Sequence, residues 1–147
     1  MQPSPLLGPV VALVAWTLVM MLWMAVARAG AFRRKGITLG TIPRGSRGGS
    51  LDGAGEDVAQ WKAHNYNHLM EQPTIFYAIV LALVLMGFDH QVNVWLAWGY
   101  VALRILHSLV QATVNIVALR LTLFLLSSLC LVSLTVHAGL RLWAGAH

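Results

Sequence analysis

Long apolar stretches alternate with short polar segments along this chain, and their lengths fit a membrane. The first stretch, residues 6–26, contains no charged residue. As a helix it measures about 31 Å, which is enough to cross the hydrocarbon core of a bilayer. The pattern predicts helices at about residues 6–30, 57–86, 91–118 and 121–143. We therefore expect an all-α protein, an integral membrane bundle of four transmembrane helices.

A stripe of polar side chains interrupts the third apolar stretch. With about 100° of rotation per residue in a helix, five polar residues fall on one face: Tyr100, Arg104, His107, Gln111 and Asn115. A charged side chain at membrane depth costs at least ~2.5 kcal/mol. The stripe should therefore face other protein groups or a water-filled site, and not lipid.

The second predicted helix has a polar first half and becomes apolar from residue 75 onward. Four polar side chains of that half share one face: His64, Asn67, His68 and Glu71. If this helix and the third form an antiparallel hairpin, Glu71 and Arg104 differ in depth by only about 3 Å. We expect this face to lie alongside the polar stripe of the third helix, in the cytoplasmic half of the membrane.

The charged residues are few and unevenly placed. Only 10% of the 147 residues are charged and 58% are hydrophobic, whereas soluble domains carry roughly 25% charged residues. Residues 1–147 are therefore expected to form one membrane domain. Seven of the ten lysine and arginine residues fall between Arg28 and Lys62. Because positive residues favour the cytoplasmic side, this loop is predicted to be cytoplasmic and both termini to lie outside the cytoplasm.

The basic loop itself carries no recognisable catalytic motif. Residues 36–55 include seven glycines and show neither helical nor strand periodicity, so they are expected to form a flexible loop. In an alternative interpretation the loop is a mobile cover over a site at the membrane face. It contains no phosphate-binding GxxxxGK[ST] motif, and no basic face of a soluble fold is available to bind nucleic acid.

Arg120 adds a second fixed cation to the polar stripe. Two arginines, a carboxylate and several amides suit a zwitterionic ligand that bears carboxylates and enters from the cytoplasm. A cation near a thiol also favours the thiolate. In a simpler alternative, a Glu71–Arg104 ion pair only fixes the register of two helices.

A haem- or small-solute-binding protein is a third interpretation. It rests on His64, His68 and His107, of which the first two have the i, i+4 spacing of helical ligands. That spacing alone is a weak signal, and no metal site is predicted.

The polar motifs resemble those of a known family. They are EQPTIFY at residues 71–77, HSLVQATVN at residues 107–115, and Arg104 followed sixteen residues later by Arg120. Their order and spacing are similar to the MAPEG family, membrane-associated proteins of eicosanoid and glutathione metabolism, and to its bacterial, microsomal glutathione transferase-like branch. The resemblance implies a homotrimer of four-helix subunits, in the bacterial inner membrane, that binds glutathione between neighbouring subunits near the cytoplasmic side.

The resemblance also implies roles for single residues. Arg120 would stabilise the glutathione thiolate as the catalytic residue. The residues expected to bind the peptide are Glu71, Arg104, His107, Asn67, His68, Gln111 and Asn115. The implied reactions are glutathione transfer to lipophilic electrophiles and reduction of hydroperoxides, with membrane lipid and a lipophilic substrate as partners.

The chain departs from the family pattern at several positions. His68 occupies the usual place of an asparagine, with Asn67 one residue earlier, and Gln111 stands where some eicosanoid enzymes have a tyrosine. Leu121 follows the thiol-stabilising arginine, where one branch has a serine. These differences argue against a prostaglandin synthase. The alternative is a non-catalytic MAPEG-fold protein whose polar face packs helices or binds another small polar ligand or a lipid.

Overall fold

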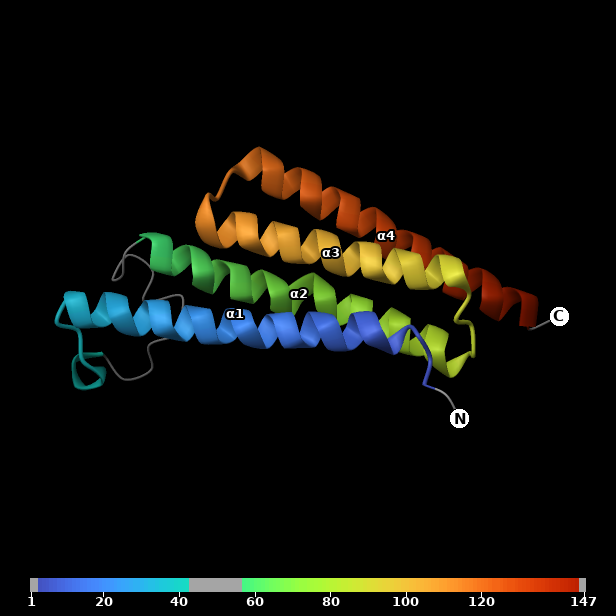
Figure 1. Ribbon diagram of the computed structural model, residues 1–147, viewed down its shortest axis with the longest axis horizontal. Coiled ribbons are helices and arrows are strands. Elements are labelled where there is room, and N and C mark those ends of the chain that lie inside the picture. Colours follow the sequence, from blue (N-terminus) through green and yellow to red (C-terminus); the bar gives the residue numbers. More distant parts are fainter. Residues whose placement is uncertain (1–2, 43–56, 146–147) are drawn as a thin grey trace.

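Four long helices lie side by side in the computed structural model (Figure 1). They are α1 (Leu7–Arg34), α2 (Asp57–Leu85), α3 (Gln91–Thr113) and α4 (Val117–Gly145), with a short 3-10 turn, η1 (Leu39–Thr41), after α1. The structure describes residues 3–42 and 57–145, and these ranges contain no strand. The predicted all-α, four-helix architecture is confirmed. Most of the predicted glycine-rich loop lies outside the described residues.

The two middle helices of the sequence are also the central helices of the bundle. Both α2 and α3 contact each of the other helices, and α1 packs mainly on α2 whereas α4 packs mainly on α3. Figure 1 shows the start of α1, the α2–α3 turn and the end of α4 at one end of the bundle. The end of α1 and the α3–α4 turn lie at the other. This arrangement keeps the two predicted cytoplasmic connections on the same side.

Within residues 3–42 and 57–145, three helices are long and apolar enough to cross a membrane: α1, the part of α2 from Gln60 to Leu85, and α4. With 23 residues, α3 is also long enough to span, but its polar stripe lowers its mean hydropathy. Its central position explains how such a helix is accommodated, because its neighbours shield the stripe from lipid.

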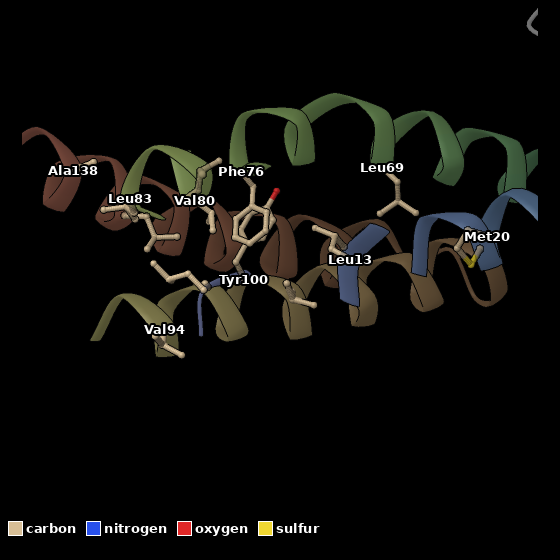
Figure 2. Packing of buried hydrophobic residues seen from close by; sticks show 14 of the residues in the cluster. Leu13, Met20, Leu69, Phe76, Val80, Leu83, Val94, Tyr100 and Ala138 are labelled. Carbon is tan, nitrogen blue, oxygen red and sulfur yellow. The ribbon is translucent and has the colours of Figure 1, made fainter. Parts of the chain in front are cut away.

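Stacked aromatic rings form the centre of the apolar core. Phe76 of α2 and Tyr100 of α3 lie almost parallel, with ring centroids 4.3 Å apart, and both are fully buried. Figure 2 shows the two rings overlapping between their helices, with Val80 and Leu83 toward one end of the core and Leu69 toward the other. This contact fixes the depth of α2 relative to α3.

The boundary between α3 and α4 differs from the prediction. α3 ends at Thr113 rather than near residue 118, and α4 begins at Val117 rather than near 121. Asn115 adopts a left-handed backbone conformation with φ of 52°, and the amides of Val114 and Asn115 both donate to the carbonyl oxygen of Val110. Asparagine tolerates this conformation better than most residues. Asn115 therefore ends the helix instead of extending its polar stripe.

Candidate functional site

The polar stripe of α3 faces the interior of the bundle. Arg104 and Gln111 are each 2% exposed and His107 is 6% exposed. The prediction that this stripe faces protein rather than lipid is confirmed. An arginine buried in this way must find hydrogen-bond partners within the bundle.

A chain of hydrogen bonds satisfies part of that requirement. Arg104 Nε donates to the Tyr100 hydroxyl at 3.2 Å, and that hydroxyl donates to Gln72 Oε1 at 3.4 Å. Gln72 Nε2 donates to Ser128 Oγ at 2.8 Å, and Ser128 donates to the Phe124 carbonyl oxygen at 2.8 Å. Each donor in the chain points the same way, from the cation on α3 through α2 to the backbone of α4.

The guanidinium of Arg104 also lies between aromatic rings. Its Cζ is 5.7 Å from the Tyr100 ring centroid and 5.4 Å from that of Phe124. Such contacts stabilise a desolvated cation without neutralising it. Arg104 therefore remains a cation within the bundle, directly behind Phe124.

The face of α2 that meets α3 is not the predicted one. Buried Asn65 donates to Ser108 Oγ at 2.7 Å, and Lys62 Nζ donates to the Ala112 carbonyl oxygen at 3.4 Å. The predicted residues His64, Asn67 and Glu71 are exposed, and His68 is half-buried. α2 and α3 are antiparallel as predicted, and residues of the two helices that lie at the same depth differ from the predicted pairs by about one helical turn. The prediction, however, assigned the wrong face of α2 to the interface.

A signal for the correct face was present in the sequence. Buried Asn65 and half-buried Gln72 are spaced seven residues apart and share a stripe with Leu69 and Phe76, which are buried. That spacing is typical of one helix face. The predicted face carries more titratable groups, namely His64, His68 and Glu71, but only His68 of these is even half-buried.

Glu71 has a different partner from the one expected in the ion-pair interpretation. Its Oε2 lies 3.1 Å from His68 Nδ1, and the Glu71 side chain is 66% exposed. Within residues 57–145 the Glu71 carboxylate and the Arg104 guanidinium form no ion pair. The predicted register-fixing pair is therefore not made within the described part of the chain.

A cavity of about 280 Å³ opens between α2, α3 and α4. Its polar lining comes from His68, His107 and Arg120, and its apolar lining includes Leu121 and Phe124. The rings of His68 and His107 meet edge to face with centroids 6.2 Å apart. Residues that the sequence predicted on three separate segments are thus brought to one cavity.

The turn before α4 orients Arg120. One terminal nitrogen of its guanidinium donates to Asn115 Oδ1, while its buried Nε has no partner among the described residues. Gln111 Oε1 and Asn65 Oδ1 are likewise buried and unpaired in this part of the chain. A buried polar atom left unpaired costs about 1–3 kcal/mol, so the region has polar groups in excess of those that helix packing uses.

The histidines do not form a metal-binding group. Within residues 3–42 and 57–145, no three His, Cys, Asp or Glu side chains are placed to hold a metal ion. His64 is exposed on α2, whereas His68 and His107 line the cavity.

Comparison with known proteins decides the family. The family model for MAPEG matches residues 6–140, which is most of the chain. The protein belongs to the MAPEG family. The match covers α1, α2 and α3 and all of α4 except its last residues, and it identifies an integral membrane protein of the family that functions in glutathione and eicosanoid metabolism. No significant match was found among curated proteins or among solved structures.

The buried amide contact predicts a specific stability defect. Ser108→Ala should lower the free energy of unfolding by about 1–3 kcal/mol, because Asn65 would then have neither of its amide groups paired. Thermal unfolding in detergent measures the change. Ser133→Ala is the matched control, since that hydroxyl bonds only to the Leu129 carbonyl oxygen of its own helix. Equal effects of the two substitutions would contradict this account of Asn65.

Proposed function

We propose that this MAPEG protein is a glutathione-dependent membrane enzyme that acts as a transferase or peroxidase on lipophilic electrophiles or hydroperoxides. The observation that carries the proposal is the cavity with His68, His107 and Arg120 on its wall. Bound glutathione supplies a thiol that attacks an electrophile or reduces a peroxide. The chain itself supplies the binding groups and the charge that holds the sulfur as thiolate.

The charges at and behind the cavity wall fit such a ligand, since Arg120 lines the cavity and Arg104 is buried behind the lining residue Phe124. Glutathione carries two carboxylates, an ammonium group and a thiol. Arg104 and Arg120 are permanently charged and suit carboxylates or a thiolate. Arg120 has a buried Nε without a partner in the described residues, so it keeps a donor for an anion. We assign thiolate stabilisation to Arg120, because a nearby cation favours that form of a thiol.

The remaining polar groups receive binding roles. We assign Arg104, supported by His107, to a carboxylate and Glu71 to the ammonium group. The residues assigned to the other polar groups of the peptide are Asn67, His68, Gln111 and Asn115. Asn115 acts by orienting Arg120, which it contacts directly.

Two features of the single chain support an oligomer, which we propose is a homotrimer with the site completed between subunits. The Glu71 carboxylate is 66% exposed on a helix that is apolar enough to span the membrane, and exposure of a charge to lipid is costly. The cavity of about 280 Å³ is also slightly below the range of about 300–1,000 Å³ for complete ligand sites. We propose that a neighbouring subunit covers Glu71 and supplies the missing wall.

The placement in the membrane follows from the charges. We propose that residues 1–147 form one domain in a bacterial inner membrane, with the basic segment after α1 in the cytoplasm and both termini outside it. The α3–α4 turn, beside the cavity, then faces the cytoplasm, where glutathione is available.

One observation favours a second candidate, a non-catalytic MAPEG protein. The hydrogen-bond chain from Arg104 to the Phe124 carbonyl oxygen ties α2, α3 and α4 together. In this candidate the polar face serves packing alone or binds a different small polar molecule.

The assigned role of Arg120 predicts a selective loss. Arg120→Ala should abolish glutathione turnover and the ultraviolet absorbance of the bound thiolate, while the protein stays folded in detergent. Arg33→Ala removes an equal charge from an exposed position at the end of α1 and should leave both signals unchanged. Unaltered turnover in Arg120→Ala would rule out its role.

A substitution at Glu71 distinguishes the enzyme from the non-catalytic packing role. Glu71→Gln should weaken glutathione binding about 10- to 100-fold, because a hydrogen bond to a charged group contributes about 1.5–3 kcal/mol. Calorimetry measures the affinity, and Asp89→Asn, in the distant α2–α3 turn, is the control. An unchanged affinity with a less stable oligomer would favour the packing role instead.

A further inference from the structure

A second and larger cavity lies at the opposite end of the bundle. It measures about 530 Å³ and is formed by the α2–α3 turn, the first turn of α3 and the last turns of α4. Figure 1 shows these segments together at the end where α2 passes into α3. From Asn93, which lines this cavity, to Arg104 is about 16 Å along α3. The cavity is therefore separate from the proposed glutathione site.

A buried hydrogen-bond pair fixes the chemistry of one wall. Asn93 is 1% exposed, and its Nδ2 donates to the Phe88 carbonyl oxygen at 3.1 Å. Its Oδ1, which only accepts, therefore faces His137 Nδ1 at 2.7 Å. His137 must carry its hydrogen on Nδ1. In the neutral ring, Nε2 is then left as an acceptor for a hydroxyl group.

The other polar groups of the cavity are donors. His90 Nδ1 accepts from the Val92 backbone amide at 3.3 Å, so the hydrogen of the neutral ring is on Nε2. The Arg141 guanidinium lies 5.4 Å from the Phe88 ring centroid and carries five N–H donors. The positive end of the α3 dipole adds to this field. The acidic residue of the turn, Asp89, is exposed and does not line the cavity.

The surroundings of the cavity are those of a membrane interface. Leu140 of α4, which lines the cavity, is 63% exposed. Trp95 of α3 and Trp143 of α4 are 67% and 73% exposed. Tryptophan is enriched at the level of lipid headgroups. A ligand held here would place its polar part against Arg141 and its apolar part along α3 and α4.

We propose that this cavity binds the headgroup of an anionic phospholipid that carries free hydroxyls, such as phosphatidylglycerol. Arg141 and His90 bind the phosphodiester, and His137 accepts from a headgroup hydroxyl. The lipid thereby joins the α2–α3 turn to the end of α4 at the membrane face opposite the glutathione site.

Native mass spectrometry of the detergent-purified protein tests this with lipids of identical acyl chains. Phosphatidylglycerol should be retained about tenfold or more better than phosphatidylcholine. Arg141→Gln should remove that preference, Arg141→Lys should keep part of it, and Arg33→Gln, an exposed arginine at the other membrane face, should not change it. Equal retention of the two lipids, or equal losses in the Arg141→Gln and Arg33→Gln variants, would overturn the proposal.

Two further experiments test the contact of His137 with a headgroup hydroxyl and whether the bound phosphate belongs to a lipid. His137→Phe should abolish the preference for phosphatidylglycerol over phosphatidic acid and leave the preference over phosphatidylcholine intact. Wild-type protein that does not distinguish the two anionic lipids would overturn the role of His137.

Soluble glycerol phosphate should not displace the lipid, and displacement at millimolar concentration would show that the site takes a soluble phosphate instead.

Discussion

The buried guanidinium of Arg104 sets a condition that the rest of this bundle has to meet. A membrane offers no water to a charge at this depth, and the apolar helices offer few partners. The bundle meets the condition with Tyr100 and Phe124 around the cation and a one-way chain of donors that ends at the backbone of α4. One charge thus occupies four side chains from three helices: Tyr100, Gln72, Ser128 and Phe124.

The same condition explains the layout of the fold. A helix with this stripe has to lie in the centre, so α3 contacts all three other helices and α2 presents Asn65 and Gln72 to it. The outer helices α1 and α4 then carry the lipid-facing surface. What the packing leaves over is informative, because Arg120 and Gln111 retain buried polar atoms without partners in the described chain. A purely structural polar core would have no use for this excess.

Periodicity and charge placement were sufficient to predict the helices and the burial of Arg104, His107 and Gln111, because a polar stripe in an apolar helix has only one stable environment in a membrane. They were not sufficient at Asn115, where a left-handed backbone conformation overrides an otherwise continuous apolar pattern. The interface of α2 was also misassigned. The buried face of α2 does carry a periodic signal, but two faces of this helix carry polar residues. Which of them is buried is settled by pairwise contacts such as that of Asn65 with Ser108.

We propose that the polar face of α3 is a glutathione site completed by a neighbouring subunit. Native mass spectrometry with glutathione is the experiment of choice, since it reports subunit number and bound ligand together. We expect a homotrimer that carries glutathione and loses it on dissociation to monomers. Glutathione retained by monomers, or a trimer that binds none at millimolar concentration, would contradict it.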